Sequence, residues 1–123
     1  MDVLEDAMRF MLMFKSEREP AAGETACKQE LPEMARVMEE LRREGILLST
    51  EGLLPAERGA RVKYAGGKLA VRDGPFAEAK ELIAGFAIVN VKSRAEAVEI
   101  AKRFLAIAGE GGAEVREVME VGN

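Results

Sequence analysis

The sequence contains no histidine among its 123 residues. Without an imidazole, neither a Ser-His-Asp nor a Cys-His nucleophile can be assembled, and the common zinc sites lose their usual ligand. Any acid–base chemistry would therefore fall to carboxylates, lysines, Tyr64 or bound water. We expect no bound metal and no cofactor.

Cysteines, long apolar runs and basic clusters are also scarce. The lone cysteine, Cys27, excludes an internal disulfide and is typical of a reducing compartment, so we expect a cytoplasmic protein. No run reaches the length of about 18 apolar residues that a membrane-spanning helix needs. The chain has 18 basic and 22 acidic residues, a net charge of −4, with no basic cluster. We therefore expect neither a membrane nor a nucleic-acid partner.

The length suits one domain, which we place at residues 8–123 after a polar extension over residues 1–7. Alternating or continuous apolar residues predict strands, and apolar residues three and four apart predict helices. Ser93, with Glu96 three residues later, is a capping-box signal for the start of the second helix. In chain order we predict a strand over Met8–Phe14, a helix over Glu30–Glu44, a strand over Ile46–Leu54, a hairpin over Ala60–Arg72, a strand over Ala84–Val91, a helix from Ser93 to Gly109, and a strand over Ala113–Val121.

This order predicts an α+β fold of ferredoxin-like type, with an antiparallel sheet and two helices on one face. Two helices cover only one face of such a sheet. The predicted strands Met8–Phe14 and Ala84–Val91 are nevertheless apolar on both faces. The uncovered face therefore needs a partner, and we expect a second copy of the chain. The alternative is a monomer whose sheet is half solvated.

The segment from Gly66 to Phe86 contains Asp73-Gly74-Pro75-Phe76, followed by AEAKE and, further on, Gly85-Phe86. Together with the upstream stretch ELRREGILLSTEGLLP, it resembles the DGPF signature of YCII-related proteins, and the resemblance runs from about Met8 to Val121. It implies a dimeric α/β barrel and, for some members, genes near those of sigma factors. Some relatives carry a His–Asp pair proposed to be catalytic. That pair cannot be transferred to a chain without histidine.

Asp73 is the leading candidate for a functional group, and two explanations of it stay open. Its carboxylate either caps the Gly-Pro turn by accepting backbone N–H bonds, or lies at the mouth of a cleft as a general base or ligand anchor. Gly74 would let the backbone approach another segment closely. The neighbouring residues are either structural or part of the same ligand site. These candidates are Arg72, Gly74, Pro75, Phe76, Lys80 and Glu81.

Two hypotheses follow for function. In the first, a homodimer binds a small organic molecule in a cleft at the sheet face, with cofactor-free acid–base chemistry if it is an enzyme. In the second, the chain is a non-enzymatic regulatory or protein-interaction module linked to sigma-factor signalling, and the DGPF segment is structural. The sequence does not decide between an enzyme and a binding protein.

Overall fold

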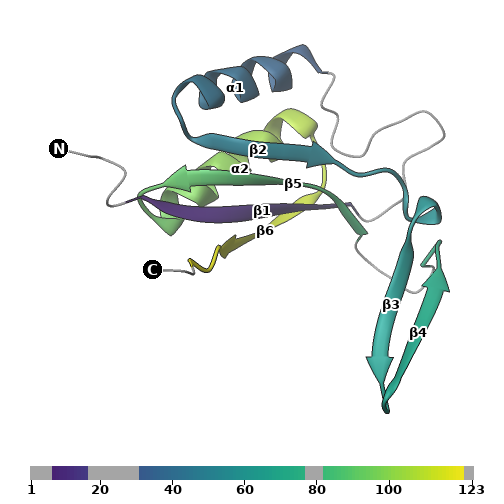
Figure 1. Cartoon of the computed structure of the whole chain (residues 1–123). Coiled ribbons are helices and arrows are strands. Elements are labelled where there is room, and N and C mark those ends of the chain that lie inside the picture. The colour runs from purple at the N-terminus through teal and green to yellow at the C-terminus, as the bar shows by residue number, and fades with distance from the viewer. Residues whose placement is uncertain (1–6, 17–30, 77–81, 121–123) are drawn as a thin grey trace.

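The computed structural model describes residues 7–16, 31–76 and 82–120. Residues 17–30, between the first strand and the first helix, and residues 77–81, after Phe76, lie outside these ranges. The described elements follow the predicted order (Figure 1). They are β1 (Met8–Ser16), α1 (Pro32–Arg43), β2 (Leu47–Gly52), the 3-10 turn η2 (Ala56–Arg58), β3 (Ala60–Ala65), β4 (Lys68–Asp73), β5 (Leu82–Val91), α2 (Arg94–Ala108) and β6 (Gly112–Glu117).

Four strands form one antiparallel sheet in the order β2-β5-β1-β6. This is the ferredoxin-like order, so the predicted fold class is confirmed. The most apolar strands, β1 and β5, occupy the centre of the sheet, where both edges of each strand are paired. Their register places Phe10 opposite Val89 and Leu12 opposite Ala87.

Both helices pack on the same face of this sheet and enclose the core. The buried residues of α1 are Met34, Val37 and Leu41, which recur at helical spacing. They share one core cluster with Phe10 and Leu12 of β1 and with the buried residues of β5 and α2, including Val89, Ile100 and Phe104. Full burial of each large apolar side chain contributes roughly 1.5–3 kcal/mol, so this layer supplies most of the stability.

The ends of the second helix follow from local sequence. The Ser93 hydroxyl accepts a hydrogen bond from the Glu96 N–H at 3.1 Å, and the Glu96 carboxylate accepts one from the Lys92 N–H at 3.0 Å. The bond to Ser93 is the predicted N-cap, and the reciprocal bond of the Glu96 carboxylate goes to Lys92, the residue before the cap. Gly109 ends the helix with a φ of 81°, which a glycine adopts without strain.

The opposite face of the sheet carries no helix. Residues paired across β1 and β5 point to the same side, so Met11 lies beside Ile88 and Met13 beside Phe86, on the face opposite Phe10 and Leu12. All four are half-buried. The prediction that both central strands are apolar on two faces is therefore confirmed.

The β3–β4 hairpin forms a separate two-stranded sheet and does not join the main one. Figure 1 shows it projecting from one end of the domain as an arm. Sequence periodicity predicts the hairpin but not its position. Among the described residues, no helix is both long and apolar enough to cross a membrane.

Candidate functional site

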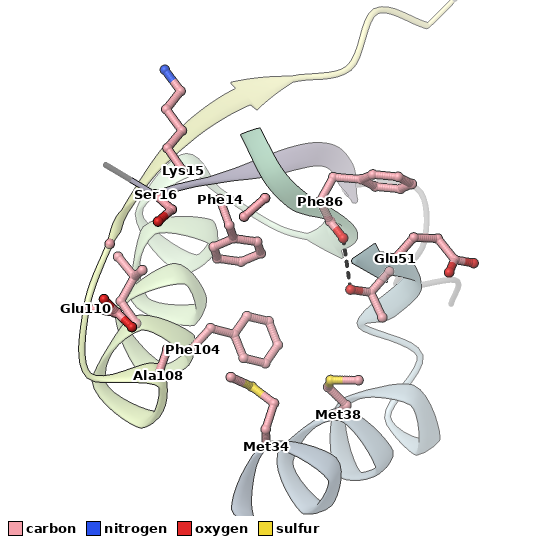
Figure 2. Close-up of a pocket in the computed structure, with 14 residues that line it drawn as sticks. Phe14, Lys15, Ser16, Met34, Met38, Glu51, Phe86, Phe104, Ala108 and Glu110 are labelled. Atoms are coloured by element: carbon pink, nitrogen blue, oxygen red, sulfur yellow. Dashed lines mark hydrogen bonds between the residues drawn. The ribbon is translucent and has the colours of Figure 1, made fainter. Parts of the chain in front are cut away.

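A cavity of about 50 Å³ lies between the helices and the sheet, at the end where β1 finishes and β5 begins, and it opens to the surface. Its walls come from the sheet and from both helices and are mainly apolar (Figure 2). The apolar wall consists of Phe14, Met34, Met38, Ala84, Phe104 and Ala108. The cavity lies on the helix-covered face, whereas the sequence predicts a cleft at the exposed face of the sheet.

The shape of the cavity follows from where the sequence places large and small side chains. The rings of Phe14 and Phe104 meet edge to face, with centroids 5.8 Å apart and planes at 76°, and hold one wall. Ala84 and Ala108 are small residues at inward positions, so they leave the space unfilled. Gly111 closes the wall beside β1, where a Cβ would lie 2.8 Å from the Lys15 carbonyl oxygen.

Figure 2 shows the rings of Phe14 and Phe104 and the ends of Met34 and Met38 facing the same space. Methionine side chains adapt readily to irregular apolar partners, because three rotatable bonds precede a polarizable sulfur and methyl. The cavity wall can therefore adapt to apolar groups of different shapes.

Polar groups are confined to the rim. The Thr50 hydroxyl donates a 2.8 Å hydrogen bond to the Phe86 carbonyl oxygen, so its proton is engaged. The side chains of Glu51 and Lys15 point away from the cavity (Figure 2). Ser16 and Glu110 complete the rim. Within the described lining, the inner wall thus offers no ionic partner, and a bound group must be largely apolar.

The Lys15 ammonium pairs with the Glu114 carboxylate at 3.0 Å, toward the helix-free face. A hydrogen bond from Lys15 and a second from Arg116 lower the pKa of Glu114 below its ordinary value. At the far end of β1, the Arg9 guanidinium hydrogen-bonds the Glu120 carboxylate and lowers the pKa of that carboxyl in the same way. Both pairs are at the surface and contribute little stability individually. Their main effect is to fix the charge pattern along the β6 edge.

The predicted site residues do not line this cavity where they are described. Asp73 ends β4 opposite Ala60, Arg72 lies opposite Arg61, and both are exposed. No hydrogen bond joins the Asp73 side chain to another described residue, so the turn-capping explanation finds no support in these ranges. Lys80 and Glu81 lie outside the described residues.

Gly74, Pro75 and Phe76 lie at the root of the hairpin. The Gly74 N–H donates to the Gly59 carbonyl oxygen at 3.0 Å, and a Cβ on Gly74 would collide with the Ala56 carbonyl. The predicted close backbone approach at Gly74 is therefore confirmed. The peptide bond before Pro75 is cis. The guanidinium of Arg61 lies over the Phe76 ring at 4.1 Å, a cation–π contact that ties the hairpin to its root.

No pattern in the sequence marks the apolar residues of this cavity as a site. Met34 and Met38 on α1 and Phe104 on α2 belong to apolar stripes at helical spacing, which is the same pattern that a fully packed core produces. Only the three-dimensional placement of Ala84 and Ala108 reveals the unfilled volume. Among the described residues, no group of three or more acidic or cysteine side chains is arranged to hold a metal ion.

The YCII-related domain model matches residues 8–122. The chain belongs to the YCII-related family. It is also 38% identical over 50 residues to an uncharacterised protein of Rhizobium meliloti (strain 1021). That match covers 41% of this chain and 40% of the Rhizobium protein, so it spans about two fifths of the relative's length.

Proposed function

We propose that this YCII-related protein binds a small organic molecule as a homodimer, with an apolar group of the ligand held in the cavity of each subunit. The observation that carries the proposal is the unfilled apolar space between Phe14, Phe104, Met34 and Met38. Protein interiors are close-packed, and voids larger than a water molecule are few in any domain. An open apolar cavity beside two aromatic rings therefore suits an apolar group of a ligand.

The volume of the cavity limits the size of the ligand group that can enter it. Pockets that enclose a whole drug-sized ligand measure about 300–1,000 Å³, whereas this cavity measures about 50 Å³. It accommodates a short alkyl chain or the edge of one ring. The rest of the molecule would extend past the rim, which Ser16 and Glu110 line.

The helix-free face supports the homodimer. Its centre is apolar, with Met11 and Ile88 side by side and Met13 next to Phe86. Its edges are polar, because Ser49 and Glu51 of β2 and Glu114 and Arg116 of β6 extend the same rows. An apolar centre with a polar rim is typical of protein interfaces, and a twofold axis lets one such face cover another.

We propose ligand binding alone for this cavity. A reaction on the bound group would need a proton donor or acceptor within reach, but the polar groups of the lining are at the rim, where the Thr50 hydroxyl is engaged. Acid–base chemistry at Asp73 stays a prediction. It would require the exposed hairpin carboxylate to meet the part of the ligand that lies outside the cavity.

Methionine methyl signals test the binding proposal with an internal control. Apolar fragments, such as short alkyl acids and small aromatic rings, are titrated into protein labelled at the methionine methyls. We expect the methyl resonances of Met34 and Met38 to shift in a saturable way, while those of Met11 and Met13 on the opposite face stay constant. Equal shifts at all four, or none, would refute ligand binding in the cavity.

One observation favours the second candidate, a protein-interaction module. One face of the hairpin exposes four apolar side chains, Val62, Tyr64, Leu69 and Val71, each to between 67% and 70%. We keep as a prediction that the regulatory partner implied by the family resemblance binds this face.

A further inference from the structure

The β3–β4 hairpin separates its apolar and its basic side chains onto two faces. In the β3–β4 register Val62 lies opposite Val71 and Tyr64 opposite Leu69, so these four side chains point to one side. Each of them is between 67% and 70% exposed. Below, these four residues are called the apolar arm face.

The basic side chains of the hairpin all point to the other side. They are Arg61, Lys63, Lys68 and Arg72, and below they are called the basic arm face. The two remaining positions on this side hold alanine. Because other residues separate these cations along the sequence, the chain contains no basic run, and the pairing of β3 with β4 is what brings them together.

The apolar arm face is large for a surface left in water. At this exposure its four side chains present roughly 500 Å², near the upper end of the patches of about 300–600 Å² that monomers leave in solvent. A two-stranded hairpin is also only marginally stable in water unless it packs on another surface. Figure 1 shows the arm projecting from one end of the domain, where an extended surface can reach it.

Opposed apolar and basic faces are typical of amphipathic segments that lie in the surface layer of an anionic membrane. The apolar side enters the boundary between headgroups and acyl chains, and the cations bind the surrounding lipid phosphates. The ribbon is narrow, with strands about 5 Å apart, so a lysine stem can bend past its edge to reach the phosphates. Tyr64 suits this position, because tyrosine is enriched at membrane–water interfaces.

A lipid surface accounts for both faces of the arm at once. A nucleic acid or an acidic protein bound to the basic arm face would leave the apolar arm face in water. An apolar protein surface would cover the apolar arm face but would give the four cations no partner. An anionic bilayer supplies an apolar layer and negative charges at the same place.

The net charge of −4 on the whole chain does not prevent this contact. Residues 60–73 carry four basic side chains and one carboxylate, Asp73, a net charge of +3. Charges in solvent are screened beyond about 8 Å at physiological ionic strength. A strand of six residues, such as β3, extends about 20 Å, so the outer part of the arm meets a membrane mainly with its own charge.

We propose that the hairpin arm attaches this protein to anionic lipid surfaces, with the apolar arm face in the interfacial layer and the basic arm face at the lipid phosphates. The attachment goes beyond the proposed ligand binding and requires neither the cavity nor the dimer. It replaces the expectation of no membrane partner, which depended on the absence of a basic cluster in the sequence.

Co-sedimentation of the full chain with vesicles tests the attachment. Binding is measured to vesicles of phosphatidylcholine mixed with phosphatidylserine, and to vesicles of phosphatidylcholine alone. We expect binding to the anionic vesicles to be stronger by about tenfold or more and to weaken as salt is added. No binding to the anionic vesicles, or equal binding to both kinds, would overturn the proposal.

Two matched lysine pairs show whether the basic arm face makes the contact. Lys63→Gln with Lys68→Gln removes two of its cations and keeps the apolar arm face. Lys92→Gln with Lys102→Gln removes the same charge from exposed positions outside the arm. We expect the arm pair to weaken vesicle binding by about 25-fold, since each cation near the surface contributes about 1 kcal/mol, or about fivefold. The second pair should weaken binding by less than about twofold, and an equal loss in both pairs would overturn the proposal.

Tyr64 reports on the apolar arm face, because it is the sole tyrosine of a chain without tryptophan. Acrylamide quenching of its fluorescence is compared with and without anionic vesicles at one protein concentration. We expect strong quenching in the free protein and several-fold weaker quenching after binding. Vesicle binding that leaves the quenching unchanged would show a contact elsewhere on the protein. Shielding that is already complete without vesicles would show that protein covers this face, and either result would overturn the proposal.

A variant of the apolar arm face completes the test. Val62→Thr with Leu69→Thr keeps strand propensity and Tyr64 but removes apolar contact area, and circular dichroism checks that it is folded. We expect it to lose both vesicle binding and the shielding of Tyr64, and wild-type values of both would overturn the proposal. The arm lysine pair leaves the apolar side chains in place, so it decides the question if the threonine variant does not fold.

Discussion

Filling the cavity is expected to raise stability and abolish ligand binding in one step. Ala108 lies in the cavity wall at the end of α2, and Ala108→Leu adds three carbons that can enter the empty space. The two effects have the same cause, because the added side chain occupies the volume that a ligand group would otherwise fill.

The magnitude follows from the volume. Empty apolar space costs about 24 cal/mol per Å³, so filling about 50 Å³ contributes about 1 kcal/mol. Burying about 50 Å² of added apolar area gives a similar value of about 1.3 kcal/mol. For a chain of this size, such a gain raises the melting temperature by about 3–5 °C.

The assay is thermal unfolding with and without a saturating apolar fragment. The matched control is Ala106→Leu, the same change at an exposed position of α2, for which we expect an effect within about 0.5 kcal/mol and an unchanged fragment affinity. A destabilised Ala108→Leu protein would show that the space cannot hold three carbons. A stabilised variant that still binds the fragment would show that binding occurs elsewhere. Either result would refute this reading of the cavity.

Three further predictions concern the hairpin root and the surface charges. Gly74→Ala should destabilise by more than about 1 kcal/mol in denaturant unfolding, because its Cβ would collide with backbone, whereas Gly112→Ala, with open space around it, should not. Asp73→Ala should change stability by less than about 0.5 kcal/mol, and a loss near 1 kcal/mol would restore the capping explanation. Because the pKa values of Glu114 and Glu120 are lowered in the folded protein, their ionised carboxylates stabilise the fold above pH 4.5, the ordinary carboxyl pKa. This stabilisation is lost as the pH falls through the lowered pKa values. In a variant with Glu→Gln at both positions, the free energy of unfolding should therefore fall less as the pH is lowered. A fall equal to that of the wild type would contradict the ion pairs.

The sequence predicts the elements well where the signals are local. The capping box at Ser93 and the glycine after α2 act within one helical turn, so no tertiary information is needed. The last strand is shorter than its alternation predicts, ending at Glu117 and not at Val121. Its partner β1 begins at Met8, and Glu117 already lies opposite Phe10. A longer β6 would therefore find almost no further residues of β1 to pair with.

The position of the hairpin and the cavity could not be predicted for a common reason. Alternation at Val62 and Tyr64 is the same whether the hairpin packs on its own sheet or projects from it. Likewise, the helical stripe that contains Met34 and Met38 does not show whether the space in front of it is filled. Both features depend on how distant segments meet, and periodicity carries no information on that.

We expect a second copy of the chain to cover the apolar surface that the two helices leave bare. Sedimentation equilibrium of the unmodified chain, extended to high dilution, tests it most directly. We predict a mass twice the 13.4 kDa of one chain, falling to that of a monomer only at the lowest concentrations. A mass of one chain at every concentration would contradict it.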